Sequence, residues 1–457
     1  MFWIKFPFLS KIENSTITNP HILLLLGVFN VAIVMNFIDL WTKNLIAFAG
    51  LVLMLMITFL NPKLWWATII NSIIALCISL KNWPRLANHS NIEVVLELLF
   101  LLFLGYKIFN KKTKISQSEL ANVFRVSLVL IYFFAGFHKL NNDFFNPCVS
   151  CVNTINNYAI KNLTFNQISF SNNGFLYLQY ATIFVEMILP FGLFFKKYRK
   201  AVAAILLLFH VYLSFTVFAD FSALAGFLIL GCLLDDENFI NNKKTENAFR
   251  VYTFFVLIAV FLKPFLLHYN NQLEQLPFII GCVFNIGWLV FFGVVWKNYN
   301  PQKSFFTKNQ IPLLLIITIG ISFWTLKTYI GLGNAGNLTM FSNLLTEKTR
   351  SNHFFIDTKN TKLFDFEEDN IMILKLHDTL NRVGLKGFKI PKIEFEVLVN
   401  EWSEKYQLCP LNAVLVYQND TIVIPDLKNS RFNQSKWWWK FVVFRKIQPE
   451  GANNCYW

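Results

Sequence analysis

Long apolar runs recur between residues 22 and 330 of this 457-residue chain. About 20 helical residues cross the hydrocarbon core of a bilayer, and most of the runs approach that length. They predict an α-helical polytopic membrane protein with about nine to eleven spans. The run Phe221–Leu234 is shorter and fits either an eighth span or a re-entrant segment. The expected spans are Ile22–Ile38, Leu45–Leu60, Leu64–Leu80, Ile92–Phe109, Leu120–Phe137, Leu176–Phe195, Ala201–Phe218, Phe221–Leu234, Val251–His268, Pro277–Trp296 and Ile311–Ile330.

The charge content agrees with a membrane location. Charged residues make up 15% of the chain, whereas soluble domains average about 25%. The net charge of +14 is typical of Lys and Arg in cytoplasmic loops, and no nucleic-acid recognition motif accompanies it. We therefore expect the lipid bilayer as a partner and no nucleic acid.

Lys and Arg are distributed unevenly between the loops. Every loop after an even-numbered span is basic, whereas loops after odd-numbered spans, such as Tyr269–Gln275, nearly lack these residues. The positive-inside rule then predicts a cytoplasmic N-terminus and an extracytoplasmic tail after Ile330. The N-terminal segment lacks the pattern of a cleavable signal peptide. We expect a multi-pass protein of the bacterial inner membrane rather than of the endoplasmic reticulum. The basic residues concerned are Lys111, Lys112, Lys114, Lys196, Lys197, Arg199, Lys200, Lys243, Lys244, Arg250, Lys297, Lys303 and Lys308.

The tail has a different pattern and predicts a small extracytoplasmic α+β domain. We divide the chain into a cytoplasmic N-terminus (1–20), a transmembrane domain (21–335) and this tail domain (336–457). A helix is expected to begin at Pro391-Lys392, because proline suits the first helical turn. Short strands are expected at His353–Asp357, Lys362–Phe366, Ile371–Leu376 and Trp437–Ile447, with a hairpin of Ala413–Tyr417 and Thr421–Ile424.

The chain has seven cysteines, and three of them (Cys77, Cys232 and Cys282) fall in expected spans. The other four, Cys148, Cys151, Cys409 and Cys455, are expected on the extracytoplasmic side, where disulfides persist. Cys148 and Cys151 form a CxxC motif, which is compatible with thiol–disulfide exchange. The alternative is a structural disulfide, either within this loop or to Cys409 or Cys455. No metal site is predicted, because no further ligands lie at the usual spacing.

Several ionisable residues interrupt the apolar runs, where a charge is costly. Arg125 and Lys263 are expected to pair with Glu97 or Glu186, unless they reach towards the interface. Glu93 and His210 also lie within or near spans.

His138 and Lys139 stand where the fifth span should surface on the extracytoplasmic side. One interpretation of Lys139 is a lysine reaching into the interfacial region. The other is a sheltered lysine whose neutral amine acts as a base. Adjacent residues on a helix point about 100° apart, so the two side chains are not expected to face one pocket.

Two short blocks resemble one family. The segment YFFAGFHKLNNDFF, residues 132–145, is similar to a segment of vitamin K-dependent gamma-carboxylase and of the wider horizontally transferred transmembrane (HTTM) domain family. Phe209-His210, followed by Phe221-Ser222, resembles a second block of that family. The resemblance extends over roughly residues 20–300. His138 departs from the carboxylase pattern, which has two adjacent lysines, and the tail is much shorter than the carboxylase's.

The resemblance implies a specific chemistry. Lys139 matches the family's catalytic base, and His210 or His138 is a candidate donor to a developing oxyanion. The cofactor would be a reduced, vitamin K-like quinone, used with O2 to carboxylate a peptide or protein substrate at the extracytoplasmic face. Such an enzyme is a lyase. Residues that bind the cofactor are not assigned.

Three hypotheses of different classes follow. The first is a quinol- and O2-dependent carboxylase or oxygenase with Lys139 as base. The second is a non-catalytic membrane scaffold or a transporter. The third is a thiol oxidoreductase that uses Cys148 and Cys151. The first predicts that Lys139 and His210 converge on one pocket that opens towards the tail domain.

Overall fold

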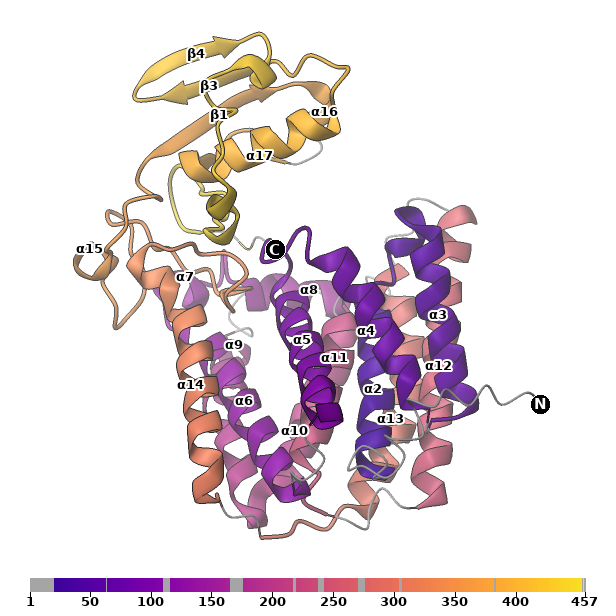
Figure 1. The fold of residues 1–457 in the computed structure, drawn as a ribbon. Helices are drawn as coiled ribbons and strands as arrows, with labels where there is room; N and C mark the ends of the chain where they lie inside the picture. Colours follow the sequence, from indigo (N-terminus) through magenta and orange to yellow (C-terminus); the bar gives the residue numbers. More distant parts are fainter. Residues whose placement is uncertain are drawn as a thin grey trace.

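The computed structural model describes residues 20–62, 64–109, 116–164, 176–216, 219–236, 242–269, 276–303, 306–381, 384–453 and 455. A bundle of roughly aligned helices is covered at one end by a small sheet domain (Figure 1). The bundle helices are α2 (Pro20–Asn36), α3 (Leu45–Leu60), α4 (Trp65–Ser79), α5 (Asn88–Phe109), α6 (Gln117–Phe137), α9 (Leu176–Ile183), α10 (Lys196–Ser214), α11 (Ala219–Cys232), α12 (Lys243–Tyr269), α13 (Leu276–Asn298) and α14 (Ile311–Leu326).

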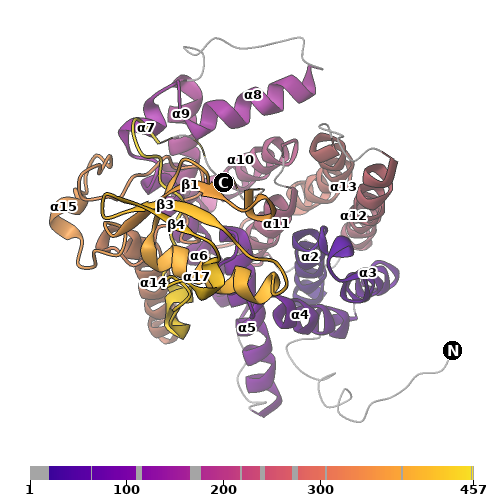
Figure 2. The same cartoon turned by 90° about the horizontal axis from the view of Figure 1, so that it is seen from above.

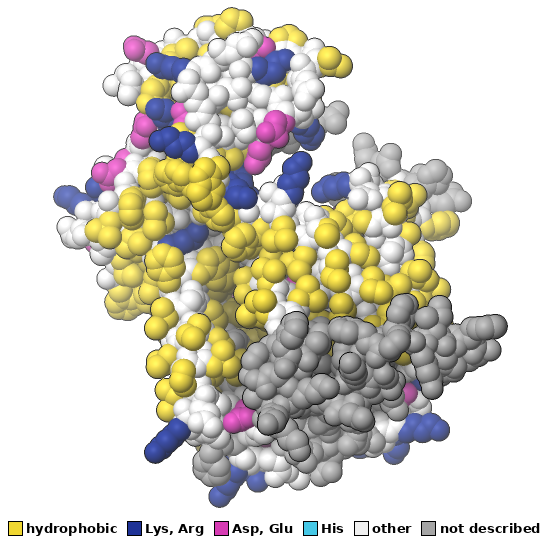
Figure 3. All heavy atoms as spheres, viewed as in Figure 1, with side chains coloured by type: hydrophobic (Ala, Val, Ile, Leu, Met, Phe, Trp, Pro, Cys, Tyr) yellow, Lys and Arg dark blue, Asp and Glu magenta, His cyan; other side chains and the backbone are white. Residues whose placement is uncertain are grey.

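The bundle is compatible with an integral membrane protein. Among the described residues, five helical stretches are long and apolar enough to cross a bilayer, and four further apolar helices are shorter. On the face shown in Figure 3, hydrophobic side chains make up much of the visible side of the bundle, whereas Lys and Arg lie at the lower end and around the sheet domain. Lipid contact is therefore plausible along this surface. The five stretches are Gln117–Phe137, Leu176–Phe194, Lys243–Leu267, Leu276–Asn298 and Lys308–Ile330.

Each expected span coincides with helical structure to within a few residues at most boundaries, although α12 begins earlier than expected. The short run Phe221–Leu234 corresponds to α11, which extends from one end of the bundle to the other. Asp220 contacts His89 near the sheet domain, with 3.1 Å between Oδ2 and Nε2. At the far end, the Cys232 carbonyl accepts a hydrogen bond from Arg125 Nε (2.9 Å).

Buried ion pairs join four segments at the end of the bundle away from the sheet domain. Asp235 accepts from Arg125 and from Arg199, each at 2.5 Å, and Tyr299 donates to the same carboxylate at 2.9 Å. The expected pairing of Arg125 and Lys263 with Glu97 or Glu186 is therefore wrong, and Lys263 pairs with Asp39 at 2.6 Å. For both Arg125 and Lys263, the carboxylate that pairs with the side chain comes from a turn between helices. The periodicity of apolar residues within a span does not predict such a contact.

The basic segments Lys196–Lys200 and Lys297–Lys303 meet at this same end, where Lys200 donates to the Tyr299 carbonyl (2.9 Å). The basic residues at 111–114, the N-terminal segment 1–19 and most of the expected loop 269–275 lie outside the described residues.

The tail contains a four-stranded antiparallel sheet in the order β2-β1-β3-β4, with α17 (Lys392–Lys405) packed on it. The expected strand at Ile371–Leu376, the helix after Pro391 and the hairpin are confirmed. The two-residue turn Gln418-Asn419 has φ values of 53° and 68°, as a type I′ hairpin requires. The strands are β1 (Asn370–Leu376), β2 (Lys389–Pro391), β3 (Ala413–Tyr417) and β4 (Asp420–Ile424).

Three expected strands of the tail are wrong. The backbone of His353–Asp357 bonds to the end of α6, where Phe354 N donates to the Leu140 carbonyl (2.9 Å). In Lys362–Phe366, Leu363 and Phe364 donate to the Ile330 carbonyl. Trp437–Phe441 is a 3₁₀ helix. The backbone groups of the first two segments are satisfied by the bundle, so they do not join the sheet.

The sheet domain lies over α6 and α14 and leaves α2, α3, α12 and α13 uncovered when viewed from above (Figure 2). Arg85, in the turn before α5, forms a salt bridge with Glu394 of α17. Burial raises the pKa of the Glu394 carboxyl, while the Arg85 guanidinium opposes that shift.

The Asp235 cluster should be a main determinant of stability. Replacing Asp235 with Ala would leave two buried guanidinium groups without their shared carboxylate, at a cost of about 3–5 kcal/mol. Thermal unfolding of purified protein in nanodiscs should show a large decrease in the transition temperature. Asp39→Ala is the matched control, because the Asp39 side chain is 65% exposed and its pair should contribute at most about 1 kcal/mol. Equal effects of the two variants would contradict this assignment.

Candidate functional site

A cavity of about 110 Å³ lies at the end of the bundle that faces the sheet domain. Its wall is largely apolar, with a few polar groups that converge on it. Pockets of this character are the usual sites for small molecules and cofactors. The lining residues are Asn88, His89, Ile92, Ile131, Tyr132, Ala135, Lys139, Val152, Ile155, Asn156, Thr182, Glu186, Phe209, Tyr212, Leu213, Phe221, Leu338, Met340 and Phe341.

Lys139 reaches this cavity from the turn after α6. Its ammonium donates to the Ala135 carbonyl at 3.1 Å and to Glu186 Oε2 at 2.7 Å. Lys139 is 5% exposed, so this is a largely buried ion pair. The sequence argument did not anticipate Glu186 as the ion-pair partner of Lys139.

A glycine allows Glu186 to approach α6. A Cβ added at Gly136 would lie 3.2 Å from the Glu186 Cβ and 3.1 Å from the Met187 Cγ, which is a tight contact. Glu186 itself lies in a π-helical turn, Phe184–Ile188, that a 3₁₀ turn containing Pro190 follows. Such π turns occur frequently at functional sites. The local widening of the helix and the absence of a side chain at Gly136 bring the two elements together.

His210 lies behind the cavity wall rather than on it. Its Nε2 is hydrogen-bonded to the hydroxyl of Tyr132, which does line the cavity. The His210 carbonyl accepts from Ser222 Oγ at 3.0 Å, and its ring lies 5.1 Å from that of Phe221. The two sequence blocks that resemble the family therefore meet at one site, with Lys139 on the wall and His210 connected through Tyr132.

His138 is not a lining residue of the cavity. Its Nδ1 is 2.9 Å from the Tyr329 hydroxyl, and its ring is fully buried against the segment that leads into the tail. The expected angular separation of His138 and Lys139 explains this arrangement. The structure thus brings Lys139 to the cavity, His210 to the residue behind it and His138 to the junction with the tail.

Sequence reasoning missed several lining residues. Tyr132 stood within the quoted motif but was not singled out, and Glu186 was considered only as a partner of Arg125 or Lys263. Leu338 and Phe341 close the cavity from the tail side and have φ values of 65° and 57°. Non-glycine residues in this conformation are strained and concentrate at functional sites. No local sequence pattern predicts that Leu338 and Phe341 adopt this conformation or line the cavity.

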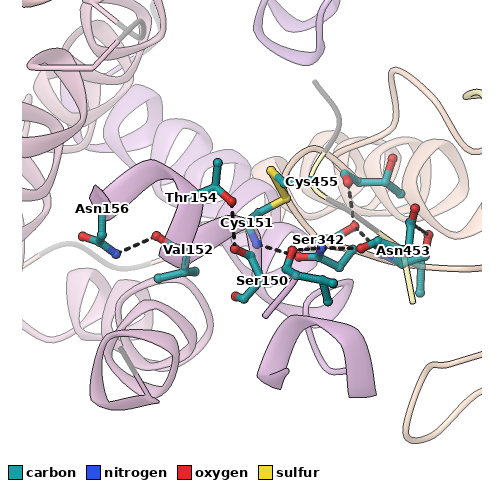
Figure 4. The surroundings of a disulfide bond; sticks show 12 residues. Ser150, Cys151, Val152, Thr154, Asn156, Ser342, Asn453 and Cys455 are labelled. Atoms are coloured by element: carbon teal, nitrogen blue, oxygen red, sulfur yellow. Dashed lines mark hydrogen bonds between the residues drawn. A yellow bond between two sulfur atoms is a disulfide. The ribbon is translucent and has the colours of Figure 1, made fainter. Parts of the chain in front are cut away.

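A disulfide joins Cys151, at the start of α8 (Cys151–Leu163), to Cys455 (Figure 4). This is one of the pairings that the sequence left open. Asn343 reinforces the junction, because its Oδ1 accepts from Cys151 N at 2.9 Å and its Nδ2 donates to the Asn453 carbonyl at 2.7 Å. Cys148 and Cys409 are exposed thiols, so the two cysteines of the CxxC motif are not joined to each other. The disulfide holds the C-terminal segment beside the cavity.

His353 attaches the segment after Phe341 to the end of α6. Its Nε2 lies 3.0 Å from the Phe137 carbonyl, while Nδ1 accepts from the amides of Phe355 and Ile356, each at 3.2 Å. This pattern requires the neutral ring. Burial lowers the pKa of His353 below its usual 6.5, in agreement with the geometry.

Within the described part of the chain, no group of three or more His, Cys, Asp or Glu side chains is arranged to hold a metal ion. Comparison of the chain with protein-family models, with curated protein sequences and with solved structures gave no match. The resemblance to the HTTM family accordingly stays a prediction, and the function is argued from the site.

The attachment at His353 should be sensitive to acid. Because its folded-state pKa is lowered, the unfolded chain binds a proton first as the pH falls, and stability decreases below about pH 6.5. Thermal unfolding of His353→Gln should therefore change less between pH 7.5 and 5.5 than that of the unsubstituted protein.

Asn141→Ala provides the control for this measurement. Asn141 also attaches the tail segment to the end of α6, donating to the Ser342 carbonyl at 2.6 Å, but it does not titrate. That variant should lose stability equally at both pH values. An unchanged pH dependence in His353→Gln would contradict the assignment.

Proposed function

We propose that this chain is a membrane enzyme that binds a reduced quinone in the cavity and uses the Lys139–Glu186 pair as its proton acceptor. The observation that carries the proposal is this pair, held at 2.7 Å on the wall of an otherwise apolar cavity. Ionisable groups in such surroundings are functional candidates, because burial without a role is costly.

The shape and lining of the cavity suit an aromatic ring. Tyr132, Phe209, Tyr212, Phe221 and Phe341 contribute aromatic side chains to the wall. A known apolar cavity of 150 Å³ binds benzene, and this cavity, at about 110 Å³, is smaller but of the same order. A quinol combines an apolar ring with two hydroxyl groups, and one hydroxyl directed at Lys139 and Glu186 would satisfy the polar part of the wall.

Proton transfer to the pair is best described for both residues together. When Lys139 is an ammonium and Glu186 a carboxylate, the pair can take up one further proton on the carboxylate. If the shared proton moves to Glu186, the Lys139 amine becomes the acceptor instead. Lys139 remains the base that the family resemblance implies, with Glu186 controlling its protonation.

The Tyr132 hydroxyl is the donor placed to stabilise negative charge that develops on a bound oxygen. It lines the cavity, and His210 holds its orientation through the hydrogen bond from behind. In this proposal His210 is a positioning residue. His138 acts at the junction with the tail and not on the reacting atoms.

The family resemblance suggests what the bound group would supply. In the carboxylase-like reaction, a quinol oxidised by O2 provides a base strong enough to remove a proton from the γ-carbon of a peptide glutamate, before CO2 adds. The contribution of this chain is to hold the ring, accept the hydroxyl proton and exclude water. A peptide or protein substrate would approach past Leu338 and Phe341, from the side of the sheet domain.

The proposal includes a topology with about nine to eleven spans. The N-terminus would be cytoplasmic and the sheet domain extracytoplasmic, in a bacterial inner membrane rather than in the endoplasmic reticulum. Support comes from the described basic segments that meet at the end of the bundle away from the sheet domain. The disulfide on the sheet-domain side agrees with an oxidising compartment.

Substitution of the pair should abolish quinol chemistry. In purified protein in nanodiscs, Lys139→Met and Glu186→Gln should each reduce quinol-dependent oxygen uptake by about 10²-fold or more, the usual contribution of a general base. Lys263→Met is the matched control, because Lys263 pairs with Asp39 and does not line the cavity. Normal oxygen uptake by a folded Lys139→Met protein would refute the proposal. Its absence in the unsubstituted protein would favour the scaffold or transporter alternative.

Thiol labelling should test the orientation. A membrane-impermeant maleimide added to intact cells should modify Cys148 and Cys409 from outside, because both are exposed thiols on the side of the sheet domain. Cys151 and Cys455 should react only after reduction. Peptide mapping by mass spectrometry distinguishes the four sites. Labelling of Cys148 and Cys409 only after the cells are lysed would place the sheet domain in the cytoplasm instead.

A further inference from the structure

Three titratable residues follow one face of α5. His89, Glu93 and Glu97 are spaced four residues apart, so their side chains lie above one another on the helix. We call these three side chains the α5 line. The line extends over roughly 12 Å, given the rise of about 1.5 Å per helical residue. All three residues are buried, with exposed fractions of 8%, 1% and 1%. The proposed quinol chemistry uses none of them.

The line begins at the cavity. His89 contributes to the cavity wall, and its Nε2 lies 3.1 Å from Asp220 Oδ2. Its other ring nitrogen, Nδ1, has no hydrogen-bond partner within the described residues. An imidazole with one nitrogen held by a carboxylate and the other available can pass a proton from one side to the other.

The line continues to carboxylates that lack full hydrogen bonding. Glu93 Oε1 accepts from Asn36 Nδ2 at 3.1 Å, while Oε2 has no partner in the described part of the chain. For Glu97, neither oxygen has such a partner among the residues described. An ionised carboxylate buried in this way is strongly disfavoured, so the neutral acid is the favoured form.

Among the described residues, no basic side chain is hydrogen-bonded to or paired with Glu93 or Glu97. The segments of α2 and α4 contain no Lys or Arg. The titratable groups that face the line are Asp220 of α11 and, across the cavity, Lys139, Glu186 and Tyr132. The nearby cations Lys263 and Arg125 are paired with Asp39 and Asp235.

Aromatic side chains pack beyond the far end of the line. Glu93 contacts Asn36 of α2, and Phe100, further along α5, packs against Phe29 of α2 with 6.3 Å between ring centroids. Glu97 lies between these two contacts along α5. Along α5, titratable groups therefore lie on the His89 side of Glu97 and aromatic rings on the other side.

We propose that Glu93 and Glu97 form a proton-holding site within the bundle that exchanges protons with the cavity through His89. Both carboxyls hold a proton at rest. A proton leaves Glu93 to Asp220, enters the His89 ring at Nε2 and leaves from Nδ1 to a base in the cavity, while Glu97 returns a proton to Glu93. The reverse steps refill the pair, with no net redox change. This inference extends the proposed function, because Glu93 and Glu97 would store protons near the Lys139–Glu186 pair. It does not require that the ligand of the cavity be a quinol.

Infrared spectroscopy of the unliganded protein in nanodiscs tests this site. The carbonyl band of protonated carboxylic acids should be present at pH 7. It should lose intensity in both Glu97→Gln and Glu93→Gln, which preserve side-chain shape. Glu401→Gln is the control, because the Glu401 side chain is 53% exposed and should not contribute to the band. After transfer to D2O, His89→Phe should slow the isotope shift of the band at least tenfold without reducing its intensity.

Three outcomes would overturn the proposal. The first is a band of unchanged intensity in both glutamine variants, which would show that these carboxyls are ionised. The second is unchanged isotope exchange in His89→Phe, which would exclude the route through the cavity. The third is loss of the band on addition of Na⁺ or K⁺ at constant pH, which would identify a monovalent cation site instead. Because no quinol is added, failure here is distinguishable from failure of quinol-dependent oxygen uptake.

Discussion

The cost of a charge inside an apolar bundle determines how this structure is organised. At the end away from the sheet domain, Arg125 and Arg199 share Asp235, so four segments of the chain are joined around one carboxylate. At the other end, Lys139 pairs with Glu186 where a cavity opens. The first arrangement is satisfied and enclosed, which indicates a structural role. The second leaves an ion pair on a cavity wall, where a ligand can reach it.

The tail segment that precedes the sheet domain is part of the site. Leu338, Met340 and Phe341 close the cavity on the tail side. The residues that follow, up to His353, bind the end of α6 through backbone and side-chain hydrogen bonds. The Cys151–Cys455 disulfide holds the end of the chain beside the same junction. A substrate or ligand that displaced Leu338 and Phe341 would therefore act directly on the contact between the two parts of the molecule. This arrangement connects access to the cavity with the position of the tail.

The cavity and the α5 carboxylates together suggest a site for proton transfer. Lys139, Glu186 and Tyr132 line one space, and His89 lies on the wall of that same space. Each of these groups changes its hydrogen bonding when it gains or loses a proton. An apolar surrounding strengthens such changes, because the effective dielectric constant is lower than in water. In the proposed function, the aromatic wall would hold the ring of the quinol.

The sequence by itself determined the mostly helical class, most of the helix boundaries in the bundle and the presence of the β3–β4 hairpin. These features follow from local periodicity and turn chemistry, which act over a few residues. It also singled out Lys139, because a lysine at the end of an apolar run is locally conspicuous. Only the tertiary structure decided that Glu186 is its partner, that His138 faces the tail and that Cys151 pairs with Cys455. Those outcomes depend on helix rotation and on contacts between residues far apart in the chain, such as the close approach at Gly136, and no local pattern encodes them.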